Sequence, residues 1–356
     1  MWNQNDLTRR LGIEWPIVVA PMAGGPSTPA LAAAASNAGA LGSFAAGYLA
    51  PDAVRDAVRE IRRLTSRPFA VNFFARDSPA GPPSEVEVES AAAALRPLRA
   101  ELALGPAAPP AALPGLDDQL DAALDAGFPV VSFTFGMLPP GALARVRAAG
   151  AVVLGTATTD EEAALLEAGG VDAVVAQGAE AGGHRGTFAG PAERALVGTM
   201  ALVPRVARRV RVPVVAAGGI ADGRGVLAAL ALGASAVQLG TAFLATPESG
   251  ASAPYKAAVA EPAAGDRTAL TRAFTGRLAR SLRNRFVDEM EGRPVLPYPF
   301  QNSLTQDLRK AAARAGRADL LSLFAGQGAP PRAGVAAGDV VAALVREARA
   351  ALDALR

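Results

Sequence analysis

The chain has a single histidine, His184, and the residues around it could make it an active-site group. It lies in Gln177-Gly-Ala-Glu-Ala-Gly-Gly-His-Arg-Gly186, directly after the apolar run 172–176, which predicts a buried strand. Imidazole is the side chain whose usual pKa lies near neutrality, so it can accept or release a proton at working pH. Gly182 and Gly183 allow the backbone to approach a flat or charged ligand closely. We therefore expect His184 to be catalytic; the alternative is a structural loop histidine.

Two glycine-containing turns at the ends of neighbouring predicted strands could bind a phosphate. Gly218-Gly219 follows one apolar run, and Gly240-Thr241 follows the next, with Gln238 and Leu239 directly before it. Barrel proteins often bind phosphate with the loops after their last two strands, where backbone N–H groups point at the ligand. The sequence therefore predicts an anion site at these two turns, and Asp222 is the expected N-cap of the helix that follows the first one.

Amide side chains stand at the ends of two other predicted strands. Asn72 and Gln177 can each donate and accept hydrogen bonds, which a heteroaromatic ring with mixed donors and acceptors would require. Pro21 and Met22 stand at the end of the first predicted strand. For each amide the alternative is ordinary capping of a loop.

The composition excludes several classes of protein and site. Of the 356 residues, 51% are hydrophobic and 19% charged, which is typical of an ordered globular protein. The absence of cysteine excludes disulfides, thiolate metal sites and a cysteine nucleophile, and one histidine leaves too few ligands for a zinc site, so we expect no metal. The net charge is +2, and the basic segment 205–211 alternates with apolar residues, as on a solvated helix face. We expect no nucleic-acid partner.

The N-terminus lacks a signal-peptide pattern, and apolar runs such as 226–232 are too short to span a bilayer. We therefore expect a cytoplasmic protein without a membrane partner.

Short β-branched runs alternate with Ala- and Leu-rich helical stretches along the chain, which predicts an α/β fold with a parallel sheet. A helix is expected to begin at Ser27-Thr28-Pro29, where a hydroxyl N-cap precedes a proline, and further helices are expected between the runs, for example at 51–65, 159–168, 199–210 and 222–232. The expected strands are Pro16–Met22, Ala40–Ala45, Phe69–Phe74, Val130–Phe135, Ala151–Thr156, Ala173–Gln177, Val214–Gly218 and Ala236–Gly240. Eight strands predict a (β/α)8 TIM barrel; a doubly wound sheet is the alternative, but no Gly-x-Gly-x-x-Gly follows the first strand.

Two segments interrupt this alternation. Residues 76–116 are rich in Pro and Ala, with a helical pattern near 85–102, and read as an insertion after the third strand. Residues after about Ala245 look helical and loop-like. We expect residues 1–245 to form the barrel, and residues 246–356 to form a helical extension that completes it and covers the active site as a small substrate-side domain.

Several motifs resemble the nitronate monooxygenase family, formerly called 2-nitropropane dioxygenases. Ala216-Ala-Gly-Gly-Ile-Ala-Asp-Gly-Arg-Gly225 and Gly233-Ala-Ser-Ala-Val-Gln-Leu-Gly-Thr241 resemble its FMN-phosphate segment, and Glu180–Gly186 its histidine loop. Ala20–Ala23 and Val71–Phe74 match its first and third strand ends, so the resemblance runs from about residue 15 to 313. It implies FMN as cofactor. The implied cofactor-binding residues are Pro21, Met22, Asn72, Gln177, Gly182, Gly183, Gly218, Gly219, Gln238, Leu239, Gly240 and Thr241.

Three further segments resemble class I of that family: Ala45-Ala-Gly-Tyr-Leu49, Val197–Pro204, and Tyr298-Pro-Phe-Gln-Asn-Ser-Leu-Thr305 with Lys310 after it. The resemblance implies that Tyr255, Tyr298 and Lys310 face the substrate. One departure is visible, because relatives often have Pro-Tyr-Arg where this chain has Pro97-Leu98-Arg99.

The resemblance implies an enzyme, an FMN-dependent oxidoreductase that converts alkyl nitronates, such as propionate-3-nitronate, and dioxygen to a carbonyl compound and nitrite or nitrate. His184 would also remove the α-proton of a neutral nitroalkane. The flavin motifs are shared with NADH-dependent reductases of quinones or enoyl thioesters, which remain the alternative, as does a flavoprotein without turnover. The segment Tyr298–Thr305 favours the first of these functions. We expect a monomer or a homodimer.

Overall fold

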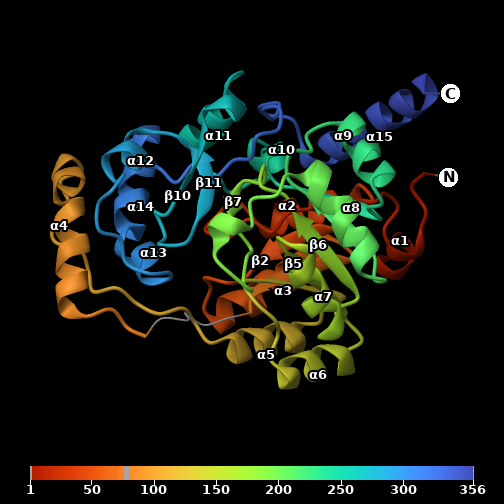
Figure 1. Cartoon of the computed structure of the whole chain (residues 1–356), viewed down its shortest axis with the longest axis horizontal. Helices are drawn as coiled ribbons and strands as arrows, with labels where there is room; N and C mark the ends of the chain where they lie inside the picture. The colour runs from red at the N-terminus through yellow and green to blue at the C-terminus, as the bar shows by residue number, and fades with distance from the viewer. Residues whose placement is uncertain (1, 76–80, 356) are drawn as a thin grey trace.

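The computed structural model describes residues 2–75 and 81–355, and in them eight parallel strands form a barrel (Figure 1). The strand order is β1-β9-β8-β6-β5-β4-β3-β2, and a bridge between Val18 and Leu41 joins the two end strands. This closure confirms the predicted TIM barrel and excludes an open doubly wound sheet. The strands are β1 (Ile17–Val19), β2 (Gly42–Ala45), β3 (Phe69–Phe74), β4 (Val130–Thr134), β5 (Val152–Ala157), β6 (Ala173–Gln177), β8 (Val214–Ala217) and β9 (Ala236–Leu239).

The strands β3 and β6 have the predicted bounds, whereas β1 is shorter than the predicted range 16–22. Ala20 still donates its N–H to the carbonyl of Leu239 (N···O 2.8 Å), but Pro21 has no N–H with which to continue the ladder. The N–H of Met22 instead donates to the hydroxyl of Ser27 (2.8 Å). The chain therefore turns away after Ala20, which places Pro21 and Met22 at the mouth of the barrel.

Helices surround the barrel, and the predicted caps begin two of them. The side chain of Thr28 accepts from Leu31 N–H, and that of Asp222 accepts from Gly225 N–H (2.8 Å). On α8 the valines of the basic segment are buried while Arg205, Arg208 and Arg209 are exposed, as predicted for a solvated face. The surrounding helices are α2 (Pro29–Asn37), α3 (Pro51–Leu64), α5 (Leu116–Ala126), α6 (Pro140–Ala148), α7 (Asp160–Ala168), α8 (Thr199–Arg209), α9 (Gly223–Ala231) and α15 (Ala337–Ala354).

The core has two layers because each strand buries both faces. Side chains such as Val19, Val71 and Phe73 pack outward against the helices. Their neighbours Val18 and Ala70 point into the barrel, where Leu7 and Leu11 of α1 (Asp6–Leu11) join the same cluster. The barrel interior is therefore filled, and a ligand can enter only at the end away from α1.

A second region lies beside the barrel mouth and contains strands that the sequence did not predict. The antiparallel strands β10 (Thr268–Thr271) and β11 (Ala279–Leu282) pair with each other, and β11 also pairs with β7 (Gly183–His184). The segment after Ala245 was predicted to be helical and loop-like, and that prediction did not include β10 and β11. The helices of this region are α10 (Thr241–Leu244), α11 (Ala253–Ala260), α12 (Arg285–Glu289), α13 (Phe300–Leu304) and α14 (Gln306–Arg314). It also contains short 3-10 turns at Gly265–Arg267 and Ala318–Leu320. A further 3-10 turn, Ala192–Arg194, follows the histidine loop.

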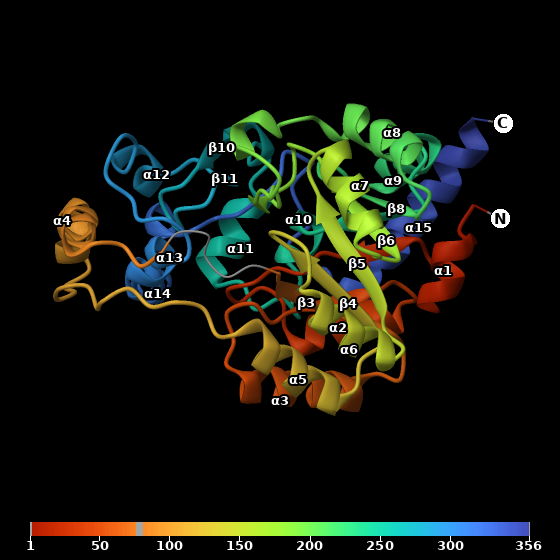
Figure 2. The same cartoon turned by 60° about the horizontal axis from the view of Figure 1, so that its bottom comes forward.

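The predicted insertion carries one long helix, α4 (Glu85–Glu101), which packs against this second region and not against the barrel (Figures 1 and 2). Arg99 forms a two-pronged ion pair with Asp307 of α14 (N···O 2.8 and 2.9 Å). Residues 76–80, the first five of the insertion, lie outside the described residues. The insertion therefore braces the elements that stand over the barrel mouth.

Candidate active site

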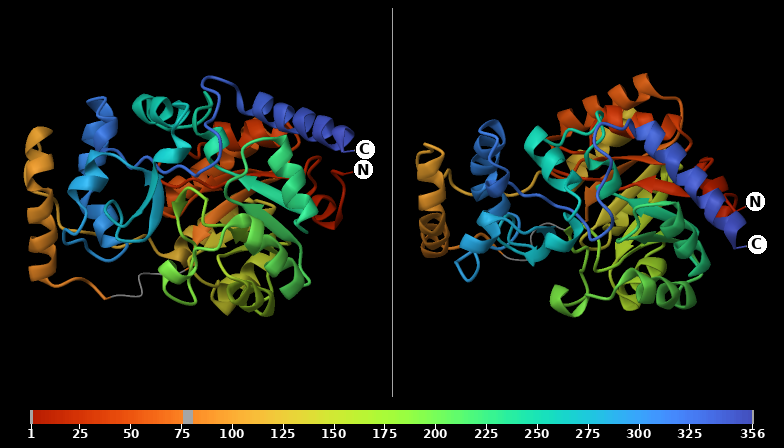
Figure 3. Two further views of the ribbon diagram at one scale, coloured as in Figure 1. Left: turned by 45° about the horizontal axis from the view of Figure 1, so that its top comes forward. Right: turned by 90° about the horizontal axis from the view of Figure 1, so that it is seen from above.

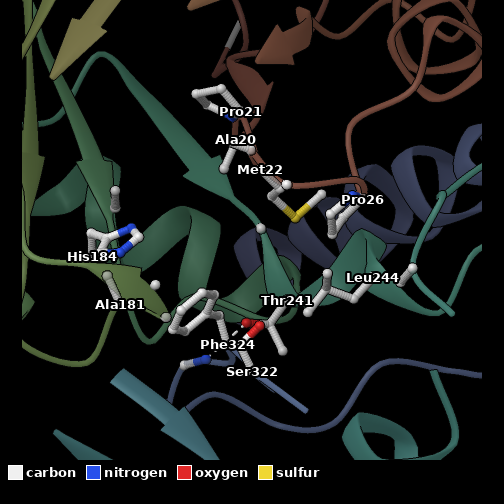
Figure 4. A pocket seen from close by; sticks show the side chains of 18 of the residues that line it. Ala20, Pro21, Met22, Pro26, Ala181, His184, Thr241, Leu244, Ser322 and Phe324 are labelled. Atoms are coloured by element: carbon white, nitrogen blue, oxygen red, sulfur yellow. Dashed lines mark hydrogen bonds between the residues drawn. The ribbon is translucent and has the colours of Figure 1, made fainter. Parts of the chain in front are cut away.

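A pocket of about 460 Å³ opens at the carboxyl ends of the barrel strands. Figure 4 shows His184 and Ala181 at one side of it and Met22, Pro26 and Leu244 at the other, with Thr241 and Phe324 between them. Among the predicted site residues, those that line the pocket are Pro21, Met22, Asn72, Gln177, Gly182, Gly183, His184, Gly218, Gly219, Gln238, Leu239, Gly240, Thr241, Tyr255 and Lys310. Tyr298 does not line the pocket but contacts the ring of His184.

One end of the pocket is built from glycine-rich backbone. The turns at Gly218-Gly219 and Gly240-Thr241 meet the segment 326–328 there. The hydroxyl of Thr241 accepts from Gly326 N–H (2.9 Å), which joins the second turn to that segment. Among the described residues, the N–H groups of Gly219 and Gly240 have no acceptor. Free backbone N–H groups at the ends of barrel strands suit an anion such as a phosphate.

The glycines at this end are required by close packing. A Cβ on Gly182 would lie 2.5 Å from the carbonyl carbon of Ala325, and one on Gly326 would lie 2.7 Å from the carbonyl oxygen of Glu180. Gly218 has a φ of +110°, and its Cβ would meet the backbone nitrogen of Ala181 at 2.9 Å. The histidine loop, the first glycine turn and the segment 325–328 can therefore form one cradle only without these side chains.

The two predicted amides also support the loops around them. Asn72 donates to the hydroxyl of Ser132 (3.0 Å). Gln177 donates to the carbonyl of His184 (3.0 Å) and accepts from Gly186 N–H (2.8 Å), so it spans the histidine loop. Both residues line the pocket, but Gln177 caps a loop as well, which was the alternative prediction for it.

The backbone and the ring of His184 are both fixed. Its backbone pairs with Ala279 in the small sheet, and its Nε2 lies 2.8 Å from the hydroxyl oxygen of Thr275. Three aromatic rings surround the imidazole, those of Phe135, Tyr298 and Phe324, with centroids 5.9, 5.7 and 5.2 Å away. The hydrogen bond at Nε2 and the surrounding aromatic rings therefore fix the orientation of the imidazole.

Burial and, to a smaller extent, the charges of Arg277 and Arg309 together lower the pKa of His184 to about 3. The sequence suggested a histidine that titrates near neutrality, whereas here the imidazole is neutral across the physiological pH range. A neutral imidazole has a free lone pair, so it can still accept a proton.

Two arginines bring positive charge to this side of the pocket. Among the described residues neither forms a salt bridge, although Glu162 lies near enough to Arg277, and Asp307 to Arg309, to oppose the lowering of its pKa by burial. Arg277 places its guanidinium 3.9 Å from the ring centre of Phe135 and donates to the carbonyls of Arg185 and Thr187. Arg309 lines the pocket and donates to the carbonyl of Asn302 (2.8 Å) and to its Oδ1 (2.9 Å). Burial lowers the pKa of Arg277 to about 10, so it remains cationic at neutral pH.

Sequence reasoning did not find this arginine pair or the aromatic wall formed by Tyr48, Phe74 and Phe135. Tyr48 lies in one of the class-defining segments, but nothing in the sequence assigned it a role; its hydroxyl meets that of Tyr298 at 3.3 Å. Phe135 has a φ of 74°, an uncommon conformation for a bulky residue. No local pattern marks these residues, because the fold brings them together from five distant segments.

The three residues expected to face the substrate differ in position. The hydroxyl of Tyr255 donates to the carbonyl of Phe324 (2.6 Å), so it can offer a substrate only its lone pairs. Tyr298 is buried behind His184. Lys310 is exposed on α14 at the rim of the pocket. Leu98, where relatives often have tyrosine, is buried among the residues that pack α4 against the second region and does not line the pocket.

Within residues 2–75 and 81–355, no three histidine or carboxylate side chains gather as a metal ion would require. In the same residues no helix is both long and apolar enough to cross a membrane.

The arrangement can therefore hold a ligand with a phosphate at one end and a flat body that reaches toward His184. At the other end, two half-buried cations can bind a small anion, and a neutral imidazole can accept a proton next to it.

The comparisons with known proteins agree with this geometry. The family model for nitronate monooxygenase matches residues 5–347. A probable nitronate monooxygenase from Staphylococcus aureus strain Newman is 43% identical over 332 residues, which cover 92% of each chain. Among solved structures, a nitroalkane oxidase from Streptomyces ansochromogenes is 47% identical with a TM-score of 0.91, covering 99% of this chain and 100% of the other. FabK from Thermotoga maritima is 31% identical with a TM-score of 0.73, covering 99% and 98%. This chain belongs to the nitronate monooxygenase family of oxidoreductases.

Proposed function

We propose that the enzyme binds FMN and oxidises alkyl nitronates with dioxygen to a carbonyl compound and nitrite or nitrate. The observation that carries this proposal is the arrangement of charge in one pocket. A glycine cradle with free N–H groups lies at one end. At the other end a neutral histidine lies beside two arginines that form no salt bridge with the described residues.

The residues of the pocket fit FMN. Its phosphate would accept from the N–H groups of Gly219 and Gly240, and its ring system would lie along the strand ends that carry Met22, Asn72 and Gln177. When bound, FMN would supply the redox chemistry, because it can take electrons from an organic substrate and pass them to dioxygen. The close-packed glycines support this assignment, since side chains there would fill the cradle.

The side of the pocket near His184 fits a nitronate. A nitronate is the anionic conjugate base of a nitroalkane, and a buried anion is stable only beside positive or hydrogen-bonding groups. Arg309 lines the pocket there, and Arg277 adds charge from behind Phe135. The surrounding aromatic rings exclude water and so strengthen these interactions.

His184 would add one step for substrates that enter as neutral nitroalkanes. The α C–H bond breaks, the proton moves to the imidazole, and the electron pair remains delocalised over the carbon and the nitro group as the nitronate. A preformed nitronate does not need this step.

The decisive experiment is anaerobic mixing of the purified enzyme with propionate-3-nitronate and, separately, with NADH, while flavin absorbance is followed. We expect rapid bleaching by the nitronate and slow bleaching by NADH, and in air we expect oxygen consumption to track nitrite release. The opposite order of rates would reject the proposal in favour of an NADH-dependent reductase of quinones or enoyl thioesters. Flavin released by acid should co-elute with FMN; FAD would refute the cofactor assignment.

A further inference from the structure

The hydroxyl of Thr275 has three hydrogen-bonding neighbours. It lies 2.8 Å from Nε2 of His184, and 3.3 Å from both the carbonyl oxygen and the backbone nitrogen of Arg277. Thr275 stands in the turn between β10 and β11 and is only 1% exposed. Water therefore cannot reach this hydroxyl, which must satisfy its three neighbours with one proton and two lone pairs.

Only one assignment of protons satisfies every group. If the Thr275 hydroxyl donates to the carbonyl of Arg277, its two lone pairs accept from Arg277 N–H and from a protonated Nε2 of His184. In the reverse assignment Thr275 donates to Nε2. The carbonyl of Arg277 then loses the one hydrogen-bond donor that the described residues give it.

We propose that Thr275 is a positioning residue that holds His184 as the Nε2–H tautomer, so that Nδ1 is the atom that takes the α-proton of a neutral nitroalkane. The hydrogen bond made by one ring nitrogen of a histidine decides which nitrogen carries the proton. In the step itself the C–H bond breaks, the proton goes to Nδ1, and the electron pair stays on the nitronate. The resulting imidazolium keeps its Nε2–H bond to Thr275.

The other contacts of His184 do not determine which ring nitrogen carries the proton. The backbone is set by pairing with Ala279 and by the bond from Gln177 to its carbonyl, and aromatic rings confine the plane of the imidazole. A 180° flip about the Cβ–Cγ bond would still keep that plane, but it would place Cε1 where Nε2 now lies and Cδ2 where Nδ1 now lies. Among the described residues, Thr275 alone makes a hydrogen bond to the ring, so it alone distinguishes the two orientations.

The chain offers a direct measurement of the tautomer because His184 is its only histidine. In holoenzyme labelled with ¹⁵N in the imidazole ring, every histidine NMR signal belongs to this residue. At neutral pH we expect a protonated, pyrrole-type Nε2 and an unprotonated, pyridine-type Nδ1. The reverse assignment would overturn the inference whatever substrate the enzyme uses.

Two substitutions test the functional consequence. Thr275→Val keeps the shape of the side chain but cannot hydrogen-bond, whereas Thr275→Ser keeps the hydroxyl. We expect Thr275→Val to lower kcat/KM for neutral nitroethane by about 10- to 100-fold, as for the loss of a hydrogen bond to a charged group. Oxidation of preformed ethyl nitronate should change much less, and Thr275→Ser should restore nitroethane turnover.

This inference depends on the proposed role of His184 as a base, and the outcomes separate the two. An equal loss for both substrates in Thr275→Val, or no rescue by serine, would make Thr275 merely structural. If the wild-type flavin is not reduced by nitronates, the proposed function fails while the NMR assignment still stands. Flavin content is measured in each variant.

Discussion

At the scale of single residues, His184 is a weak base placed where it can still act. Its neutral form is favoured by burial and by two arginine charges, and an isolated imidazolium there would be costly. A nitronate formed as the proton arrives would offset that cost, because its negative charge lies beside the new positive one. The site therefore favours a proton transfer that creates an anion over simple protonation by solvent.

Replacing His184 should affect two kinds of substrate differently. In His184→Asn the side chain can hydrogen-bond but cannot accept the α-proton. We expect turnover of neutral nitroalkanes to fall by on the order of 10²–10⁴-fold, the usual contribution of a positioned base. Oxidation of preformed nitronates should fall less. Steady-state oxygen consumption with nitroethane and with ethyl nitronate, normalised to bound flavin, measures both.

An equal loss for both substrates would show that His184 orients the anion and is not a base. If both activities survive, the histidine is structural.

The depressed pKa of His184 also makes the stability of the fold depend on pH. In the unfolded chain His184 binds a proton below its usual pKa of 6.5, whereas in the folded protein it does so only below about 3. Between these values the unfolded state binds more protons, so stability is lost as the pH falls. We expect the free energy of unfolding to drop by on the order of 1–2 kcal/mol between pH 6.5 and pH 5.

Urea unfolding at pH 7.0, 6.0 and 5.0 measures this drop, and His184→Gln is the control in which it should vanish. The carboxyl of Asp307, whose pKa Arg99 lowers, stays ionised throughout this pH window and so does not contribute to the drop. The same slope in both proteins would contradict the pKa shift.

At the scale of elements, the predictions from sequence were most accurate where a local pattern of residues marks the end of a strand. The apolar runs of β3 and β6 end where the strands end, and the glycine turns after β8 and β9 reach the pocket. The strands β7, β10 and β11 were missed because none of them contains the run of apolar β-branched residues that marked the barrel strands; β7 is Gly-His and β11 is Ala-Arg-Ser-Leu. Their pairing nevertheless brings Thr275 and Arg277 to His184, so the same omission hid part of the site.

The first glycine turn offers a test of the proposed phosphate cradle. Gly219 has a φ of +73°, and its Cβ would lie 3.3 Å from Cβ of Glu180. Gly219→Val should strain the turn by about 1–3 kcal/mol, or move the N–H that would bind the phosphate. We expect FMN affinity to fall by about tenfold or more, measured by fluorescence titration of flavin-stripped protein.

Gly190→Val is the matched control, because Gly190 is exposed, its φ is not positive, and a Cβ added there would have no atom within 4 Å. Equal FMN affinity in the two variants would argue against a phosphate at this turn.

At the scale of the whole molecule, the ring of helices around the barrel is closed by a helix from the C-terminal end of the chain. The chain leaves the barrel after β9, builds the second region over its mouth, and returns as α15, which lies across the barrel between α2 and α9 (Figure 3). The alternation of strands and helices predicted the barrel, but it could not show which C-terminal helix would close it. That choice depends on contacts between residues more than 120 positions apart, such as the bond from Gly223 N–H to Glu347 (3.0 Å).

Two glycines on α9 test how closely α15 must approach. A Cβ on Gly223 would lie 2.1 Å from the backbone nitrogen of Ala348, whereas a Cβ on Gly225 would meet only the side chains and backbone of its own turn, at 3.3 Å or more. Gly223→Ala should therefore push the two helices apart and lower the free energy of unfolding by about 1–3 kcal/mol. Gly225→Ala should leave it unchanged or raise it by up to about 1 kcal/mol, since alanine is the better helix former. Urea unfolding of both variants measures the difference. Equal stability would mean that α15 can shift on α9 without cost, and that closure of the ring depends on its contact with α2 instead.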